Sequence, residues 1–470
     1  MKEIITRVNA APADLSPEGT NHCAGAPVSR FGGKPKVFLQ TYGCQMNEYD
    51  SELVKSILTG AGYEFVADAA LADIVMLNTC SVRENAHRKV FGNIHEIRHA
   101  RKGRSVAIGI LGCMATALRK DLLEDKSLAL DFVVGPDSYK RLPDILRSVT
   151  EDHTQGYDAT LSEFETYADV YPSRTDGVNA WVAVMRGCNN FCSFCIVPFT
   201  RGRERSRSLN SIVEEVRRLA AEGFPQVTLL GQNVNSYHDS GHDFAALLEA
   251  VSRIEGIRRI RFTSPHPKDF PDSLVEVLAH NPKVCKQVHL PLQAGNDRVL
   301  DLMRRNYTSA DFMQLVGRLR KACPGLALST DVIVGFPTET DAEFADTMRV
   351  MREVRFDTAF MFKYSVREHT RAARELPDDV PEAAKTERIV ALNMQQTDIS
   401  LECNKALVGQ VQSVLVEQGS GSRKGAAAYA RNDANKVVAL VSGQFVPGQF
   451  VDARIIRATP HQLKAEPTVS

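Results

Sequence analysis

The chain has 470 residues, of which 43% are hydrophobic and 24% charged, a composition typical of a globular protein with a hydrophobic core. Lysine and arginine together number 57, as do aspartate and glutamate, so the zero net charge excludes a histone-like polyanion binder. No apolar run reaches the ~20 residues of a membrane helix, and the N-terminus lacks the apolar stretch of a secretory signal, so we expect a cytoplasmic protein without membrane contact.

The first third of the chain predicts a short arm followed by a layered domain. Residues 1–34 are rich in Ala, Pro, Gly and Ser without periodicity, which predicts a disordered arm with one idle thiol, Cys23. Over 35–150, apolar strands alternate with amphipathic helices, which predicts an open α/β domain with a parallel sheet. The expected strands are 37–42, 73–77, 105–111 and 132–134, and the expected helices are 50–61, 84–100, 116–124 and 138–149.

Three cysteines stand at equivalent places in this domain. Cys44, Cys80 and Cys113 each follow directly on an expected strand. Open parallel sheets bind ligands beyond the carboxyl ends of their strands, so these thiols should converge at one edge. The alternative is three unrelated core cysteines, because free Cys is often buried. Gly43 and Gly112 would let the backbone approach a bulky cofactor at the shared site.

A second, larger strand–helix domain follows a linker. Residues 151–176 are polar and aperiodic, which indicates the linker, and over 177–403 six strand–helix units predict a partial (β/α)6 barrel. The expected strands are 181–186, 227–230, 260–263, 287–291, 327–334 and 358–364, and the expected helices are 211–222, 244–254, 272–279, 309–322, 339–354 and 382–404.

The first strand of this barrel leads into the sequence Cys188-Asn-Asn-Phe-Cys192-Ser-Phe-Cys195. Three cysteines cannot all pair as disulfides, and in a reducing cytoplasm clustered cysteines are more often metal ligands. They suit an iron–sulfur cluster, whereas structural zinc usually needs two CxxC-like halves and this chain has one. Either a distant fourth cysteine completes the site or one iron is left open for a substrate. Because barrel active sites lie at the carboxyl ends of strands, the cluster should lie at the barrel mouth.

The C-terminal part, 404–467, has short β segments at 410–417, 427–430, 436–441 and 449–458, which predict a small β-barrel of roughly OB type. Residues 404–470 hold eight Lys or Arg and four Asp or Glu, a net charge of +4 that favours nucleic-acid binding, with a merely solvated basic surface as the alternative.

Four arginines also alternate just after the cysteine loop and would share one face of an extended segment. This face would suit phosphate contacts, or it could be a charged surface without a partner. The residues predicted to contact RNA are Arg201, Arg203, Arg205, Arg207, Arg423, Lys424, Arg431 and Lys436.

Taken together, residues 36–466 resemble the radical S-adenosylmethionine (SAM) methylthiotransferases. The CxxxCxxC loop is similar to that of radical SAM enzymes, and the upstream three-cysteine domain and TRAM-like barrel are similar to those of methylthiotransferases. Gln45-Met46 after the first cysteine resembles the MiaB branch, which acts on tRNA, whereas the ribosomal-protein branch, RimO, usually has Pro-Lys there. Further matches are Gly231 to Tyr237, His289 to Gln293 and Ser329 to Pro337. The loop Val366-Arg-Glu-His-Thr370 departs from the usual pattern, which leaves its detail open.

The resemblance implies an enzyme that adds a methylthio group to carbon 2 of N6-isopentenyladenosine at position 37 of tRNA, with SAM as both methyl donor and radical source. It implies a radical SAM [4Fe–4S] cluster on Cys188, Cys192 and Cys195, which would carry the catalytic radical chemistry, and an auxiliary [4Fe–4S] cluster on the three upstream cysteines. The residues expected to contact SAM are Asn233, Asn235, His289, Gln293, Asp331, Gly335 and Pro337. For Gly335 and Pro337 a simple turn before a Thr340–Glu343 capping box is the alternative.

The implied partners are tRNA bearing isopentenyladenosine, SAM and an electron donor such as flavodoxin or ferredoxin, and we expect a monomer. Two alternatives stay open. A ribosomal-protein methylthiotransferase shares all six cysteines, although Gln45-Met46 argues against it. A non-catalytic iron–sulfur RNA-binding protein would need a closed fourth ligand at either cluster.

Overall fold

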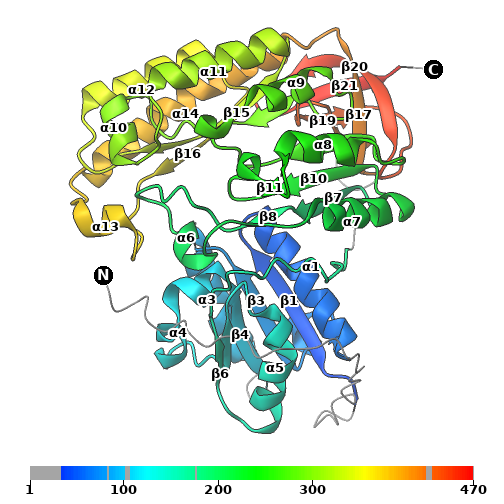
Figure 1. The fold of residues 1–470 in the computed structure, drawn as a ribbon, viewed down its shortest axis with the longest axis vertical. Helices are drawn as coiled ribbons and strands as arrows, with labels where there is room; N and C mark the ends of the chain where they lie inside the picture. The colour runs from blue at the N-terminus through cyan, green and yellow to red at the C-terminus, as the bar shows by residue number, and fades with distance from the viewer. Residues whose placement is uncertain (1–32, 82–83, 101–105, 175–176, 420–425, 469–470) are drawn as a thin grey trace.

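The structure, a computed structural model, describes residues 33–81, 84–100, 106–174, 177–419 and 426–468. Cys23 and nearly all of the expected arm lie outside the described residues. Figure 1 shows the N-terminal domain in blue and cyan, the larger central domain in green to orange and the small C-terminal barrel in red. None of the described helices is both long and apolar enough to cross a membrane.

The N-terminal domain is the predicted α/β layer with a parallel sheet. Its strands are β1 (Lys36–Tyr42), β2 (Glu64–Phe65), β3 (Ile74–Thr79), β4 (Ala107–Gly112), β5 (Phe132–Val134) and β6 (Gly156–Asp158), and its helices are α1 (Gln45–Gly60), α2 (Glu84–Ala100), α3 (Cys113–Leu118), α4 (Asp121–Glu124) and α5 (Leu142–Glu151). All neighbours pair in parallel in the order β2-β1-β3-β4-β5-β6. The strands are continuous apolar runs because α1 and α5 cover one face of the sheet and α2, α3 and α4 cover the other.

Three details of this domain differ from the expectation. α1 begins at Gln45, earlier than predicted, because it starts directly after the loop that ends β1. The helix expected at 116–124 is two short helices, α3 and α4. The expected linker at 151–176 contributes the edge strand β6 and buries Tyr167 completely, so part of it belongs to the sheet and its core.

The central domain has the six predicted strand–helix units of a partial barrel. The strands are β7 (Asn179–Ala183), β10 (Gln226–Leu230), β13 (Arg259–Phe262), β14 (Gln287–His289), β15 (Ala327–Val334) and β16 (Thr358–Lys363), and the helices are α7 (Leu209–Ala221), α8 (Phe244–Ser252), α9 (Asp272–His280), α11 (Ser309–Ala322), α12 (Asp341–Val354) and α14 (Glu382–Lys405). Two parallel sheets, β13-β10-β7 and β14-β15-β16, are joined by a parallel bridge between Ile260 and Val284.

Short elements that the sequence pattern did not predict decorate the barrel mouth. They are β8 (Met185–Arg186), α6 (Val197–Thr200), β9 (Arg205–Ser206), β11 (His238–Asp239), β12 (His242–Asp243), α10 (Asp297–Leu302) and α13 (Arg371–Glu375). The strand expected at 181–186 therefore ends at Ala183, and its continuation β8 pairs with β9 as a small antiparallel ladder. This ladder redirects the chain toward the N-terminal domain, where Figure 1 places α6.

The two α/β domains share one hydrophobic core. α1 packs against β7, the edge strand of the barrel. Ala183 and Leu230 of the barrel belong to the same buried cluster as Tyr49 and Leu53 of α1, and Trp181 packs against that cluster. The N-terminal domain is therefore docked by apolar burial as well as by the polar contacts described below.

The C-terminal part is the predicted small barrel. Its strands are β17 (Val411–Gln418), β18 (Ala428–Arg431), β19 (Val437–Leu440), β20 (Phe450–Ala458) and β21 (Leu463–Pro467), closed in the order β17-β18-β19-β21-β20. The pattern missed β21. Arg259 and Arg261, from β13, donate to backbone carbonyls of Ser413 at 2.6 Å and Asn432 at 2.7 Å. These contacts lie near the starts of the central-barrel strands, away from their carboxyl ends.

Candidate active site

Three thiols meet at the carboxyl edge of the N-terminal sheet, as the strand-end rule predicts. Cys44 caps α1 after β1, Cys80 follows β3, and Cys113 begins α3 after β4, and these three strands are neighbours. A hydrogen bond with Cys80 is the main cause that lowers the pKa of Cys44 to about 6, and Arg201 lowers this pKa further against the effect of burial. Burial raises the pKa of Cys113, and Arg201 partly offsets this.

Two buried asparagines join the Cys44 loop to the Cys80 loop. Asn47 Nδ2 donates to Asn78 Oδ1 at 3.1 Å, and Asn78 Nδ2 donates to the Asn47 carbonyl at 2.9 Å. A Cβ on Gly43 would lie 2.7 Å from Cys80 Cβ, and one on Gly112 would lie 2.3 Å from Asn78 Oδ1. The glycines that we expected to make room for a cofactor therefore make room for the neighbouring loops.

Cys188, Cys192 and Cys195 lie in one loop at the mouth of the central barrel, between β8 and α6. The loop is anchored from the far side of the barrel, because the Ala372 amide at the start of α13 donates to the Ser193 carbonyl at 2.7 Å. Burial raises the pKa of Cys188 to about 11 and that of Cys195 to about 12. Thiolates in this loop therefore need a compensating positive charge.

Each cysteine set receives one buried guanidinium. Arg305 Nη1 donates to Cys192 Sγ at 3.3 Å, and Arg201 Nε donates to Cys113 Sγ at 3.1 Å. Both arginines are buried. Arg201 also pairs with Asp50 at 2.7 Å, whereas no carboxylate in the described part of the chain forms an ion pair with Arg305. A donor and a positive charge beside each sulfur favour the thiolate that a metal ligand requires.

The four alternating arginines lie mostly inside the protein, not at an RNA surface. Arg201, Arg205 and Arg207 are between 2% and 7% exposed, so the prediction that they contact phosphate is wrong. The carboxylates that neutralise them are Asp50 for Arg201 (2.7 Å), Asp137 for Arg205 (3.1 Å) and Glu215 for Arg207 (2.6 Å). Arg203 is exposed and lies over the Phe191 ring, 5.7 Å from its centroid, so its contact with RNA stays a prediction.

Asp50 is the centre of a charge network between the two α/β domains. Its carboxylate is fully buried and accepts from Arg186 at 2.6 Å and from Arg201 at 2.7 Å. The Arg186 guanidinium also lies 4.8 Å from the centroid of the Tyr167 ring. Removing charges from water costs several kcal/mol per ion and is tolerated only where every charge keeps a partner. The docked arrangement of the domains therefore depends on each of these pairs.

Asn233, one of the predicted SAM contacts, lies beside the cysteine loop. Its Nδ2 donates to Asp269 Oδ2 at 3.1 Å and lies 3.5 Å from Glu204 Oε1, and Glu204 in turn accepts from the Asn189 amide at 3.1 Å. The Asn233 Oδ1 is buried and has no hydrogen-bond partner in the described part of the chain. A buried acceptor of this kind needs an unseen partner, which a bound ligand could supply.

Three other predicted contacts are already engaged within the protein. Asn235 accepts from the His266 amide at 2.7 Å and donates to its carbonyl at 2.9 Å, which is a structural role. His289 bonds Ser329 Oγ at 3.1 Å and lies 3.4 Å from Asp331, so these two candidates face each other across β14 and β15. Their contact with SAM stays a prediction.

The remaining candidates lie on connections around β15. Gln293 pairs with Val332 in an isolated parallel bridge and has a positive φ of 68°. Gly335 also has a φ of 68°, and its amide donates to Glu339 Oε2 at 2.6 Å, while Pro337 is buried in the same turn. The expected capping box is confirmed, with Thr340 and Glu343 as its members. The turn is thus explained locally, and its contact with SAM stays a prediction.

His266 is a residue of the barrel mouth that the sequence pattern missed. The ring packs edge-on against Tyr307, and its Nδ1 accepts from the Lys268 amide at 3.3 Å, so the proton of the neutral ring lies on Nε2. This Nε2 is buried without a partner in the described residues. Burial, followed by the charges of Arg305 and Lys268, lowers the pKa of His266 to about 2. The only sequence signal was that this histidine stands between two prolines, in Pro265-His-Pro267, just after β13.

The buried neutral His266 predicts a dependence of stability on pH. Its pKa falls from the unfolded value of 6.5 to about 2 on folding, so below pH 6.5 the unfolded chain binds one more proton than the native protein. The free energy of unfolding should therefore fall with acidification by up to about 1.4 kcal/mol per pH unit from this group. Urea unfolding of wild type and His266→Asn between pH 7.5 and 5 should show a shallower slope in the variant. Equal slopes, or the same change in the exposed-site control His242→Asn, would contradict this assignment.

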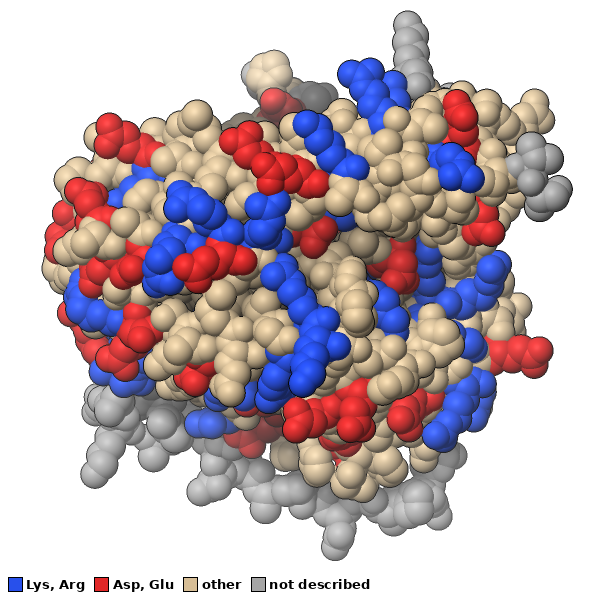
Figure 2. Space-filling model, turned by 90° about the horizontal axis from the view of Figure 1, so that it is seen from above, with Lys and Arg blue, Asp and Glu red and all other residues tan. Residues whose placement is uncertain are grey.

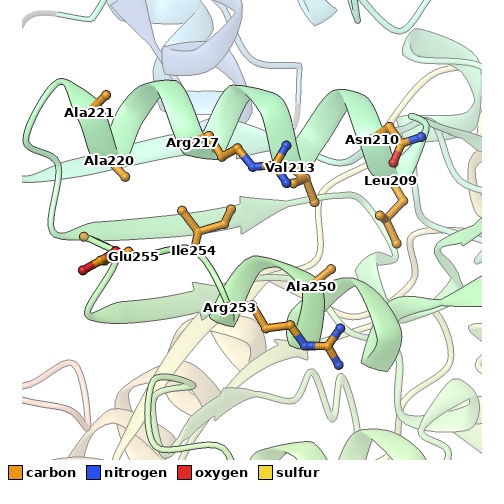
Figure 3. Close-up of a pocket in the computed structure, with 11 residues that line it drawn as sticks. Leu209, Asn210, Val213, Arg217, Ala220, Ala221, Ala250, Arg253, Ile254 and Glu255 are labelled. Atoms are coloured by element: carbon orange, nitrogen blue, oxygen red, sulfur yellow. The ribbon is translucent and has the colours of Figure 1, made fainter.

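Two cavities lie away from the cysteines. One is a groove of about 700 Å³ between α7 and α8 on the outside of the barrel. Figure 3 shows residues that line it, among them the apolar Val213 and Ile254 and the charged Arg217 and Arg253. A second cavity, of about 310 Å³, lies between the starts of β14 to β16 and the C-terminal barrel. Neither is lined by a cysteine of the two sets, so neither is the candidate active site.

The basic residues predicted on the C-terminal barrel have mixed outcomes. Lys436 is nearly buried and bonds Asp357 at 2.6 Å, so the prediction that it contacts RNA is wrong, because it joins the two barrels instead. Arg431 is partly exposed and pairs with Glu417 at 3.0 Å. Arg423 and Lys424 lie outside the described residues. Figure 2 shows positive and negative side chains interspersed over one face of the molecule, in keeping with the zero net charge.

The chemistry of each cysteine set fits an iron–sulfur cluster. The first set offers three thiols at three strand ends and the second offers three thiols in one loop, and each set has one buried N–H donor to a sulfur. Hydrogen bonds to the sulfurs are a regular feature of such centres. Within the described residues, no three His, Cys, Asp or Glu side chains are grouped to hold a single metal ion. In a cubic four-iron cluster each thiolate binds a different iron, so the three sulfurs need not lie as close together as the ligands of a single metal ion. A four-iron cluster held by three protein thiolates would have one iron without a protein ligand.

Comparisons with known proteins agree with this arrangement. Residues 36–135 match the Uncharacterized protein family UPF0004, residues 182–351 the Radical SAM superfamily and residues 405–468 the TRAM domain. The chain is 45% identical to the tRNA-2-methylthio-N(6)-dimethylallyladenosine synthase of Prosthecochloris aestuarii, over 90% of this chain and 96% of that protein. It is 41% identical to the mitochondrial tRNA methylthiotransferase CDK5RAP1 of Rattus norvegicus, over 92% and 81%. The solved structure of the radical SAM methyltransferase TsrM from Kitasatospora setae shares the fold, with a TM-score of 0.54 at 15% identity over 72% of this chain and 74% of that chain.

Proposed function

Because the chain belongs to the radical SAM tRNA methylthiotransferase family, we propose that it methylthiolates carbon 2 of N6-isopentenyladenosine at position 37 of tRNA. The observation that supports this most is the 45% identity to a synthase of this product over nearly the whole chain, including all three domains. Carbon 2 of the base is an unactivated aromatic C–H position, where acid–base groups give little help and a radical cofactor is needed.

The roles of the two cysteine sets follow from their places in the fold. Cys188, Cys192 and Cys195, at the barrel mouth, would hold the radical SAM cluster, and Cys44, Cys80 and Cys113 would hold the auxiliary cluster. When bound, the first cluster would supply the electron that cleaves SAM, and the second would supply a site beside which sulfur is transferred.

Side chains around the mouth would orient SAM and keep water out. Asn233 Oδ1 is an acceptor without a partner in the described residues, and the same side chain contacts Glu204, which bonds the cysteine loop. We therefore assign this acceptor to SAM. Phe194 packs edge-on against Phe336 at a centroid distance of 6.4 Å, which covers the loop between Cys192 and Cys195 with apolar surface. Arg305 would hold its N–H donor on Cys192 throughout.

We further propose that the enzyme works as a monomer in the cytoplasm and receives electrons from a small donor such as flavodoxin or ferredoxin. A tRNA substrate supports the cytoplasmic location. So does the state of the described cysteines, all of which are free thiols.

The test is an assay with two possible substrates. The reconstituted, reduced protein should convert isopentenylated tRNA to the 2-methylthio form in the presence of SAM, measured by mass spectrometry of the released nucleosides. The same tRNA without the isopentenyl group is the matched control and should react at least about tenfold more slowly, because that group would otherwise fill an apolar part of the site. Methylthiolation of a ribosomal protein instead of tRNA would favour the ribosomal-protein alternative.

A further inference from the structure

Arg201 connects the two cysteine sets across the domain boundary. It follows Cys195 by one short helix, α6, and therefore belongs to the central domain. Its Nε nevertheless donates to Cys113 Sγ of the N-terminal domain at 3.1 Å, and its Nη2 donates to Asp50 Oδ2 at 2.7 Å. The third nitrogen, Nη1, is buried without a hydrogen-bond partner in the described residues.

These contacts exceed what docking of the two domains requires. Asp50 keeps a second ion pair, with Arg186 at 2.6 Å, and Arg205 makes an equivalent bond to Asp137 at 3.1 Å without touching a cysteine. The N–H donated to Cys113 and the unpartnered Nη1 are thus two donors of Arg201 that no carboxylate uses. The first of these donors lies at the edge where the auxiliary cluster of the proposed function would bind.

We propose that Arg201 is a positioning residue that sets the reduction potential of the auxiliary cluster held through Cys113. A positive charge and N–H donors beside cluster sulfurs stabilise the reduced state, which carries one more negative charge, and so raise the potential. Since Arg201 is carried by the central domain, the auxiliary cluster has this potential only while the two domains are docked. The inference rests on the proposed function, because it takes the auxiliary cluster as given.

The test uses the full chain with Cys188, Cys192 and Cys195 replaced by alanine, so that only the auxiliary cluster is present. Arg201→Met, Arg201→Lys and the control Arg205→Met are added singly, and the midpoint potential is measured by redox titration followed by electron paramagnetic resonance. We expect Arg201→Met to retain iron and to shift the potential to a more negative value. Arg201→Lys, which keeps the charge but loses the planar Nε donor, should lie between it and the parent.

The control separates tuning from docking, because Arg205 is buried in the same network without a sulfur contact. Arg205→Met should leave the potential at the parent value. An unchanged potential in Arg201→Met, or an equal shift in Arg205→Met, would overturn the role of Arg201 while leaving the auxiliary cluster in place. Failure of the parent protein to bind any iron would instead overturn the auxiliary cluster of the proposed function. If Arg201→Met does not fold, the charge-retaining Arg201→Lys decides by the same readout.

Discussion

Simultaneous replacement of Cys188, Cys192 and Cys195 by alanine should abolish methylthiolation and SAM cleavage while about half of the bound iron remains. All three thiols lie in the loop at the barrel mouth, and thiolates are the ligands that hold such clusters. The remaining iron should belong to the N-terminal set, which lies in a different domain and shares no ligand with this loop. Iron and sulfide analysis after anaerobic reconstitution, together with detection of 5′-deoxyadenosine, measures both effects.

The reciprocal variant, with Cys44, Cys80 and Cys113 replaced by alanine, should also lose about half of the iron but should still cleave SAM. Cys285→Ala is the control, since this thiol is also buried but lies before β14 in the central barrel rather than at the mouth. It should keep all of the iron. Full iron content in either triple variant would refute the two-cluster assignment.

Replacement of Asp50 by alanine should lower the free energy of unfolding by roughly 3–5 kcal/mol, because it leaves two buried guanidinium groups without their shared carboxylate. Arg186 and Arg201, the two partners, are 1% and 3% exposed, so water cannot replace the lost charge without opening the domain interface. Urea unfolding at neutral pH measures the change. Opening should also make the interface loops more sensitive to limited proteolysis.

The matched control for Asp50 is an ion pair on the surface. Glu214 pairs with Arg217 at 3.3 Å, and the two side chains are 75% and 63% exposed. Glu214→Ala should change the free energy of unfolding by less than about 1 kcal/mol, because water and salt screen exposed pairs. A loss as small as this in Asp50→Ala would show that the network does not hold the domains together.

The pattern of the sequence was sufficient to place the six cysteines in the fold, because their positions depend on local rules. A cysteine directly after a strand of a parallel sheet lies at the carboxyl edge of that sheet, whatever the rest of the chain does. The sequence pattern alone therefore places Cys44, Cys80 and Cys113 at the same edge. The six strand–helix units of the barrel were predictable for the same reason, since apolar periodicity is local. The capping box at Thr340 and Glu343 is a third case of this kind.

The alternating arginines show where such local rules stop. Alternation predicted one shared face for the four arginines, but Arg203 is exposed while the other three are buried, because only 205–206 of this segment is a strand. Which surface covers each arginine is a property of the docked domains. Two of the carboxylates that receive them lie far away in the sequence, Asp50 on α1 and Asp137 in the loop after β5, whereas Glu215 on α7 follows Arg207 by eight residues. The same limit explains Lys436 and His266, whose surroundings are supplied by distant segments.

The core that α1 shares with β7 and β10 has a consequence for how such proteins can be recombined. Because Ala183 and Leu230 are packed with Tyr49 and Leu53, a cut between the two α/β domains would expose apolar surface on both halves. The C-terminal barrel, by contrast, meets the central barrel through polar bonds such as those of Arg259 to backbone carbonyls, which any chain of the same backbone shape can accept. Exchange of the last module for another of the same backbone shape keeps these bonds, whereas its removal would leave Arg259 and Arg261, 5% and 6% exposed, without these acceptors. The first two modules must be inherited as a single unit.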